Sequence, residues 1–500
     1  MTARKLRPKP SKGEEPSSRV DEEDSPTDVN GNPTLPPQAV GRYRPLPTGM
    51  HGLDPELVKS DQRERLRNAM VELIAAKGYQ AVRIIDLARL ARVSQPTFYS
   101  LFGDKEELFV SAYDEIAERT YRAVIEAYGA DESKANSLLV ALRAYTELAA
   151  AEPEAMSLLV LGAFGAGSRA LEHRKRSLEA LESRIRASRD GDPQSESTDL
   201  TVKVILGGIR EVTAIRLVRE REDQLPGLAG ELAAWASCYP RRAPAGLEAP
   251  PATPPSGPAG PIPRSERARR AEGRLPSGRS DLPREAIVAS QSERIVDATA
   301  SIVAEKGLAG LTIPEIARRA SVSHQTFYDI YPSKHDAFLG AQKVGMMQAL
   351  RMGVEAWEAE MPDWPRAIAA GLRAVVDYIV SEPAHAHLSI VDTFGASPET
   401  IETRDEILRG FATYFNPGYD LAPEGVEVPA VAAEAGVGGC WQVLHHYVEN
   451  ERIADLPGAA PQLTYMLLTP FLGPTEAARV ALLPIADSEG GPQAADEASA

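Results

Sequence analysis

With 500 residues, of which 43% are hydrophobic and 25% charged, the chain is expected to form folded domains with substantial cores. Its two cysteines exclude a disulfide scaffold and a cysteine zinc site, and no run of about 20 apolar residues predicts a membrane span. The formal net charge of −16 opposes binding to nucleic acid, so any such site must be a local basic patch.

Residues 1–50 are predicted to be a disordered tail, because they are rich in Pro, Ser, Gly and charge and show no apolar period. They contain no apolar stretch typical of a signal peptide, so the protein is expected in the cytoplasm.

Two copies of one unit follow, and an internal repeat of this kind decides the domain organisation. The segment QPTFYSLFGDKEELF at 95–109 matches HQTFYDIYPSKHDAF at 324–338 with a constant offset of 229. The match continues with Glu152-Pro153 and Glu382-Pro383 at offset 230, and with Gly207-Gly208 and Gly438-Gly439 at offset 231. Residues 55–240, called unit 1, and residues 285–480, called unit 2, are therefore predicted to share one fold.

Each unit is predicted to be all-helical and to begin with a helix-turn-helix. Apolar residues at helical spacing predict a first helix in each unit, which Gly78 and Gly307 end. A short second helix follows, and a three-residue break separates it from a third helix for which Ser94 and Ser323 are suitable N-caps.

The third helix is predicted to bury Phe98 or Phe327 and to leave its polar residues outward, where threonine and tyrosine hydroxyls suit phosphate contacts. A lysine, Lys105 or Lys334, then opens the fourth helix in both copies. The helix macrodipole disfavours a cation there by about 0.3–1 kcal/mol, and a DNA phosphate would explain it.

Beyond unit 1, residues 241–284 form a Pro-rich linker with a basic end, most simply solvated and alternatively an arm for the minor groove. Residues 481–500 are expected to form a second disordered tail.

The segments TIPEIARRASVSHQTFYDIYPSKHDAF and IIDLARLARVSQPTFYSLFGDKEELF resemble the DNA-binding segment of the tetracycline-repressor (TetR) family. The resemblance implies helix-turn-helix DNA-binding domains at 55–110 and 285–340. It also implies helical ligand-binding and dimerisation domains at 111–240 and 341–480, whose last two helices form a four-helix bundle with a partner.

By the same resemblance, the third helix of each unit enters the major groove. The residues carried over to the DNA interface are Arg83, Gln95, Pro96, Thr97, Tyr99 and Lys105 in unit 1, and Thr312, His324, Gln325, Thr326, Tyr328 and Lys334 in unit 2. Arg83 departs from the family's usual phosphate-binding threonine, which Thr312 matches. Arg92 and Ser321 stand where the family often has glycine, so strain is expected in the turn.

Four residues of the later helices are candidates for a ligand pocket, although core packing explains each of them as well: Phe164, Phe394, Trp441 and His445. No cofactor or metal is expected, because adjacent histidines on a helix point to different faces and no carboxylate stands at ligand spacing beside them.

These features predict a sequence-specific DNA-binding transcription regulator, a repressor that a small-molecule effector releases. The two units are expected to form an intrachain pseudo-dimer on an asymmetric operator. The third helix of each unit, called its reader because it is expected to contact the bases, has Ser100 in unit 1 and Asp329 in unit 2 at equivalent positions. A dimer of tandem chains is the alternative assembly. The alternative functions are a helical ligand-binding or interaction protein with degenerate helix-turn-helix segments and, third, an enzyme, for which no nucleophile–base pair or phosphate loop is found.

Overall fold

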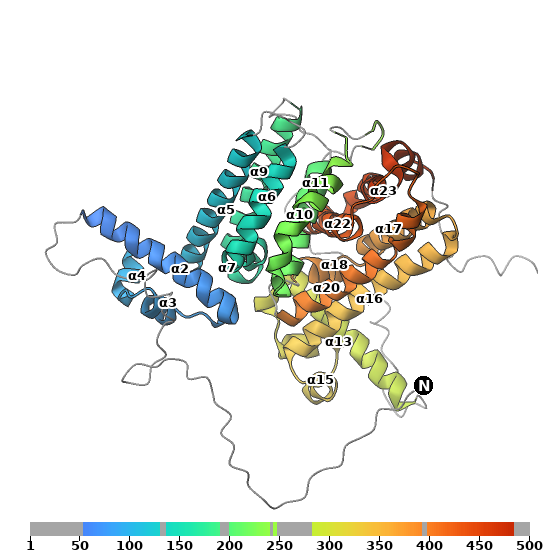
Figure 1. The fold of residues 1–500 in the computed structure, drawn as a ribbon. Coiled ribbons are helices and arrows are strands. Elements are labelled where there is room, and N and C mark those ends of the chain that lie inside the picture. The colour runs from blue at the N-terminus through green and yellow to red at the C-terminus, as the bar shows by residue number, and fades with distance from the viewer. Residues whose placement is uncertain are drawn as a thin grey trace, which may run out of the picture.

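The computed structural model describes residues 54–130, 137–190, 200–240, 244–247, 283–392 and 398–484, and the regular secondary structure within these ranges is entirely helical (Figure 1). The all-α prediction is confirmed. None of the described helices is both long and apolar enough to cross a membrane. The predictions for the first tail and for most of the linker and of the second tail concern residues outside the described ranges. The second tail was predicted to begin at residue 481, which is still the last residue of a helix.

Unit 1 begins with the predicted helix-turn-helix and continues into a helical domain. Its α-helices are α2 (Pro55–Ala81), α3 (Ile84–Leu90), α4 (Gln95–Leu101), α5 (Lys105–Ala130), α6 (Ser137–Ala151), α7 (Pro153–Ser157), α8 (Ala163–Ala166), α9 (Ser168–Asp190), α10 (Thr201–Val218) and α11 (Ala229–Ser237). A π-helical turn (Leu158–Gly162) precedes α8, and a 3₁₀ segment (Glu222–Leu228) precedes α11.

Unit 2 repeats this order. Its α-helices are α13 (Arg284–Lys306), α14 (Ile313–Ala320), α15 (His324–Ile330), α16 (Lys334–Glu360), α17 (Trp364–Ser381), α18 (Pro383–Ile390), α20 (Pro398–Thr413), α21 (Asn416–Leu421), α22 (Ala432–Glu449) and α23 (Leu456–Ala481). Short 3₁₀ turns at Leu308–Gly310 and Ile453–Asp455 precede α14 and α23.

The glycines predicted to end the first helices adopt the left-handed backbone that this role requires. Gly78 has a φ of 72° and Gly307 a φ of 66°, conformations that side chains with a Cβ rarely adopt. In α2 the helical pattern resumes for one turn after a kink at Gly78, whereas α13 stops at Lys306.

The two units pack against each other through α10 and α22, which cross in the middle of the molecule beside α11 and α23 (Figure 1). Glycines allow the backbones of these two helices to approach each other closely. A Cβ on Gly207 would lie 2.7 Å from the Cβ of Gln442, and a Cβ on Gly439 would overlap the carbonyl oxygen of Val204. One apolar core runs through both units, and in it the hydroxyl of Tyr239 donates to the carbonyl of Met466 at 3.0 Å.

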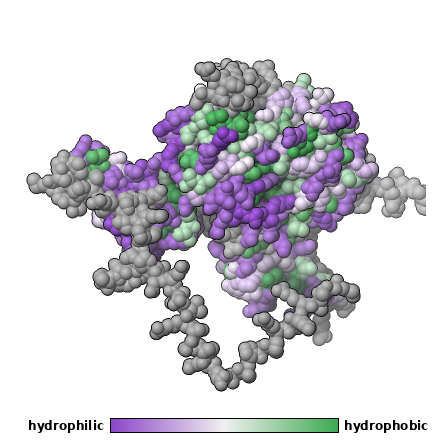
Figure 2. Space-filling view, in the orientation of Figure 1, coloured by the Kyte–Doolittle hydropathy of each residue, from purple (hydrophilic) through white to green (hydrophobic). Residues whose placement is uncertain are grey.

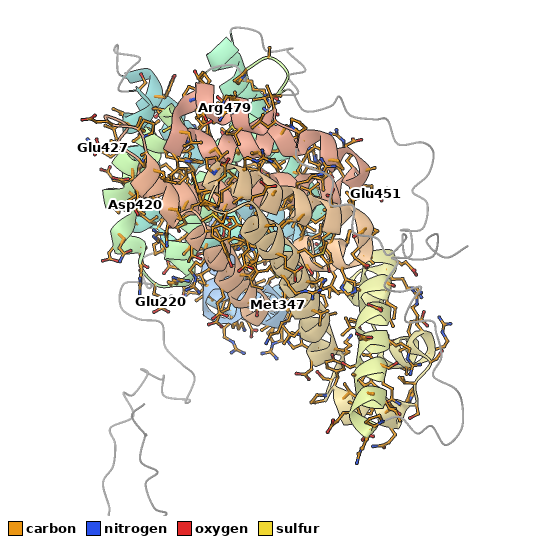
Figure 3. All side chains as sticks on the ribbon, turned by 90° about the vertical axis from the view of Figure 1, so that its right-hand side faces the viewer. Glu220, Met347, Asp420, Glu427, Glu451 and Arg479 are labelled. Carbon is orange, nitrogen blue, oxygen red and sulfur yellow. The ribbon has the colours of Figure 1, made fainter. Side chains whose placement is uncertain are left out.

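Polar contacts across the crossing are reciprocal, as an approximate two-fold relation requires. Arg404 of unit 2 donates to the carboxylate of Glu211, and the equivalent Arg174 of unit 1 donates to Gln442 Oε1 at 3.4 Å. The equivalent residues Glu220 and Glu451, which follow α10 and α22, are both left-handed, with φ of 52° and 57° (Figure 3). The intrachain pair therefore has the arrangement of a symmetric dimer with diverged halves.

The face of the molecule seen in Figure 2 is mainly hydrophilic, with apolar residues in scattered groups. The two helix-turn-helix regions lie on the same side of the α10–α22 crossing, the lower side in Figures 1 and 3. Both helix-turn-helix regions of one chain thus lie on one side of the molecule.

Candidate nucleic-acid interface

The turn before each third helix is held by an arginine of the first helix. Arg294 donates through Nη1 to the carbonyls of Ala320, at 2.9 Å, and Ser321, at 3.2 Å. The equivalent Arg65 donates to the carbonyls of the corresponding turn in unit 1. Sequence reasoning missed these arginines, although they stand at the same offset of 229 on an otherwise apolar face.

The turn residues themselves carry the expected strain. Arg92 and Ser321 have φ of 53° and 52°, in the left-handed region that costs a residue with a Cβ about 1–2 kcal/mol. The following amides donate back across the turn, Val93 to Ala88 at 2.9 Å and Val322 to Ala317 at 3.0 Å. These hydrogen bonds fix the direction in which the third helix leaves the turn.

The third helices, α4 and α15, begin at the predicted N-caps. Ser94 Oγ accepts from the amide of Thr97 at 3.1 Å, and Ser323 Oγ accepts from the amide of Thr326 at 3.0 Å. The threonine hydroxyls also contact the capping hydroxyls, so each threonine has a defined rotamer before any DNA contact.

The outer face of these helices carries the residues predicted to meet DNA. Gln95, Pro96, His324 and Gln325 are exposed, and Thr97 and Thr326 are half-buried. The exposed fractions of Tyr99 and Tyr328 are 55% and 53%, and each ring packs edge-on against the buried phenylalanine that precedes it. The predicted division into buried Phe98 and Phe327 and outward polar residues is confirmed.

The two readers differ in how their polar residues are held. Gln325 Nε2 donates to Asp329 Oδ1 at 2.8 Å, which ties the amide to the outer end of α15. In α4 the position of Asp329 is taken by Ser100, whose hydroxyl donates to the carbonyl of Thr97 at 2.7 Å, and Gln95 has no such carboxylate neighbour in sequence.

The lysines that open the fourth helices bind the protein's own backbone. Lys105 Nζ donates to the carbonyls of Tyr79 and Val82 at 2.9 and 3.0 Å, and Lys334 Nζ donates to the carbonyl of Leu311 at 2.9 Å. Burial lowers the pKa of Lys105. An ammonium has three donors, so one proton of Lys105 and two of Lys334 are left for a phosphate, and that contact stays a prediction.

The residues before the second helices have different roles in the two units. Thr312 caps α14, because its hydroxyl accepts from the amide of Glu315 at 3.4 Å. Arg83 provides no side-chain cap for α3, and its guanidinium instead pairs with both oxygens of Asp86 at 3.1 Å. That hydrogen bond and one from Lys77 hold the pKa of the Asp86 carboxyl well below its usual range.

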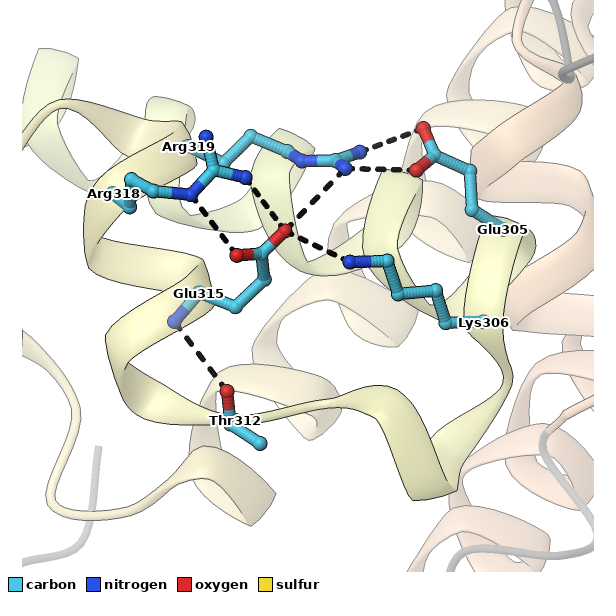
Figure 4. Close-up of polar contacts among 6 residues, drawn as sticks. All are labelled: Glu305, Lys306, Thr312, Glu315, Arg318 and Arg319. Atoms are coloured by element: carbon cyan, nitrogen blue, oxygen red, sulfur yellow. Dashed lines mark hydrogen bonds and ion pairs between the residues drawn. The ribbon is translucent and has the colours of Figure 1, made fainter.

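Glu315 is the centre of an ion-pair network beside α14 that sequence reasoning did not identify (Figure 4). Its carboxylate accepts from Arg318 at 2.7 Å and from Lys306 at 3.0 Å, and Arg319 pairs with Glu305 at 2.7 Å. The hydrogen bond from Arg318, followed by the one from Lys306, lowers the pKa of Glu315 to about 2. Unit 1 has an acidic residue, Asp86, at the position equivalent to Glu315, and this repeated acid was the signal in the sequence for the network.

A cavity of about 140 Å³ lies in the helical domain of unit 2, between α16, α17, α18, α20, α22 and α23. Its lining is almost entirely apolar and includes the predicted Trp441. The predicted His445 lies elsewhere, beside Arg174 in a smaller charged cavity between the units, where burial holds its pKa well below the usual range. The side chain of Phe164 and the whole of Phe394 lie outside the described part of the chain.

Within the described ranges, no group of three or more His, Cys, Asp or Glu side chains is placed to hold a metal ion.

Residues 66–112 and 295–340 each match the family model for "Bacterial regulatory proteins, tetR family", and the two matches cover both helix-turn-helix regions. Among solved structures, the fatty acid degradation regulator FadR from Bacillus halodurans is similar at 16% sequence identity, with a TM-score of 0.32. The match covers 35% of this chain and 94% of that chain. No curated protein matches the chain.

Proposed function

Because the chain belongs to the tetR family of bacterial regulatory proteins and carries the family's DNA-binding segment twice, we propose that it is a repressor that a small molecule releases from one asymmetric operator. As a member of that family, it is a DNA-binding transcription regulator. The finer statements, repression, ligand release and one chain per operator, are the proposal.

The pairing of α10 with α22 inside one chain is the observation that carries this proposal. Two third helices must be held about 34–36 Å apart to enter successive major grooves, and separate subunits normally pair to achieve this. Here the crossing joins unit 1 to unit 2 with reciprocal contacts from Arg174 and Arg404. This pairing of the two units inside one chain supports the proposal that a single chain occupies both half-sites.

The two readers present different side chains to the two half-sites. Unit 1 offers Gln95-Pro96-Thr97 and unit 2 offers His324-Gln325-Thr326, so the half-sites are proposed to differ in sequence. Asp329 adds a negative charge to the second reader only. A carboxylate accepts from the cytosine amino group and repels phosphate, which makes the two halves still less alike.

Release is proposed to begin in the cavity of unit 2. The equivalent positions in unit 1 carry larger side chains: Ile116 for Gly345, Val124 for Gly353, Met156 for Ala386 and Leu159 for Ser389. Arg210, which replaces Trp441, donates to the carbonyls of Leu159 and Val160 at 3.2 and 3.3 Å. We infer one effector per chain, bound in unit 2 and favouring a conformation in which the readers no longer fit the operator.

Sedimentation of the complex with a duplex selected by the protein from random sequence tests the assembly. We expect one chain per minimal operator, and a selected site whose two halves differ. Two chains per minimal operator, or a perfectly palindromic selected site, would exclude the intrachain pair and favour a dimer of tandem chains.

A further inference from the structure

A buried histidine connects the cavity of unit 2 to the DNA-binding domain. His385 belongs to α18 and lines the cavity, and its Nε2 lies 3.0 Å from Oδ1 of Asp297 on α13. Both side chains are buried. Since α13 is the first helix of the second helix-turn-helix, this hydrogen bond joins a cavity wall to the reader's scaffold.

The bond to Asp297 determines what His385 can offer a ligand. A carboxylate only accepts hydrogen bonds, so Nε2 carries the hydrogen, and in this tautomer of the imidazole Nδ1 is an acceptor. Within the described part of the chain, Nδ1 has no hydrogen-bond partner. A Cβ on the cavity residue Gly345 would lie 3.5 Å from Nδ1, so the missing side chain of this glycine leaves Nδ1 at the cavity surface.

Two indoles of the cavity wall offer the complementary group. The buried Nε1 atoms of Trp357 and Trp441 find no acceptor among the described residues. A buried donor without a partner calls for an explanation, and a ligand that accepts from it is one. A hydroxyl can donate to His385 and at the same time accept from an indole, which an ether, a hydrocarbon or a ketone cannot.

The histidine link occurs only in the unit that has the described cavity. At the positions of Asp297 and His385, unit 1 carries Asn68 and Ala155, and larger side chains replace the small cavity residues. The acceptor, the partner carboxylate and the small residues thus differ together between the units, as they would if they served one ligand.

We propose that the effector is a small apolar molecule with one hydroxyl, which donates to His385 Nδ1 and changes the position of α13 through Asp297; this proposal rests on the ligand-released function above. Apolar cavities of about 150 Å³ accept a single benzene ring, so a cavity of about 140 Å³ suits a phenol or an alcohol of similar size.

The step from α13 to the reader is short. Arg294 lies one turn before Asp297 on the same helix and holds the carbonyls of Ala320 and Ser321 in the turn before α15. A shift of α13 therefore moves the turn that aims the second reader, while unit 1 keeps its own geometry.

Binding by the full-length chain is measured with phenol, toluene and anisole, which share one ring but differ in hydrogen bonding. Phenol is expected to bind about 2- to 10-fold more tightly than toluene, the range of one net hydrogen bond. The double variant D297N/H385A, which recreates the unit 1 pair, loses the acceptor and should show a smaller preference for phenol over toluene. Equal binding by the natural protein, no binding of any probe, or an unchanged preference in the variant would overturn the donor requirement.

Coupling is measured as the dissociation constant for the selected duplex with and without saturating phenol. In the natural protein we expect phenol to raise this dissociation constant about 5-fold or more. In D297N/H385A we expect neither phenol nor toluene to raise it. H387A/D392N is the matched control, because His387 lies on the same helix as His385 and does not line the cavity, and it pairs with Asp392 just beyond the end of that helix at 2.8 Å. It should keep the full response.

The possible failures are distinguishable. If phenol binds but leaves DNA affinity of the natural protein unchanged, ligand release itself is wrong. If the natural protein and D297N/H385A respond equally, release stands and the histidine link is wrong. Should the double variant not fold, H385A alone, which leaves Asp297 in place, gives the same two comparisons. D297N alone keeps an acceptor for Nε2 and should retain the preference for phenol.

Discussion

At the scale of single residues, a few side chains determine how each third helix is aimed. Arg294 and its equivalent Arg65 tie the first helix to the turn, and a left-handed residue follows in both units. The apolar pattern predicted the helices, and the resemblance predicted strain at Arg92 and Ser321. The arginine ties depend on a side chain reaching carbonyls 26 and 27 residues away, which helical periodicity does not encode.

Replacing Ser321 by glycine should stabilise the second DNA-binding domain. Glycine removes the left-handed penalty of about 1–2 kcal/mol but adds freedom to the unfolded chain, so we expect a net gain of about 0.5–1 kcal/mol. Thermal unfolding measures it. Ser301→Gly, within α13, is the control and should lose stability; a loss at both positions would contradict strain at the turn.

Lys334→Ala separates the structural role of the lysine from its predicted phosphate contact. Losing the hydrogen bond to Leu311 should lower stability by about 1 kcal/mol. Losing a phosphate contact should weaken binding to all sequences alike and reduce the salt slope by about one unit. Lys343→Ala, an exposed lysine on the same helix, is the control. A stability loss with an unchanged salt slope would leave the lysine a purely structural residue.

At the scale of elements, the same helix-turn-helix is built with different electrostatics in the two units. Unit 2 surrounds Glu315 with Lys306 and Arg318, while unit 1 places Lys77 and Arg83 around Asp86. In the DNA-free protein, Glu315 thus partly neutralises the positive charges of Lys306 and Arg318 beside α14. This matters for a chain of net charge −16, whose DNA affinity depends on local cations.

The Glu315 network predicts a pH-dependent stability of this element. The folded-state pKa of Glu315 is about 2, below its ordinary value of 4.5, so its contribution is fully present above about pH 4.5. It is lost as the pH falls from 4.5 towards 2. Glu315→Gln should therefore show a smaller fall of melting temperature in this window than the natural protein. Glu293→Gln, an exposed acid of α13, should follow the natural curve; identical curves for all three would contradict the network.

Because the effector is proposed to bind in the cavity of unit 2, one larger side chain in the cavity wall should abolish effector binding. Ala386→Met introduces the residue that unit 1 carries as Met156 and should fill part of the cavity. We expect effector binding and release to be lost, DNA binding to persist, and stability to rise by about 0.5–2 kcal/mol. Ala359→Met, at an exposed position of α16, is the control for added apolar surface. Undiminished release by the Ala386 variant would place the effector elsewhere.

At the scale of the whole molecule, the repeat predicted two units but not how they meet. Matching Gly207-Gly208 with Gly438-Gly439 showed shared descent, whereas the reason for the glycines, contact between the two helix backbones, appears only when α10 and α22 cross. The sequence did not predict the cavity either, because its wall comes from six helices whose packing one sequence does not define.

Gly439→Ala tests the crossing. Its Cβ would overlap the carbonyl of Val204, so we expect a loss of about 1–3 kcal/mol and much weaker operator binding, with each helix-turn-helix still folded. At Gly436 of the same helix, an added Cβ meets only Leu467 at 3.5 Å. Gly436→Ala should gain up to about 1 kcal/mol from helix propensity. Equal effects at the two positions would contradict a close crossing.

The crossing of α10 and α22 within one polypeptide also changes how the regulator responds to its own abundance. Separate subunits dissociate on dilution, so the paired fraction of a dimeric regulator falls as its concentration falls. A covalently joined pair has an effective concentration that does not depend on copy number. If one chain fills one operator, as proposed, operator occupancy at low protein concentration rises in proportion to the number of chains rather than to its square.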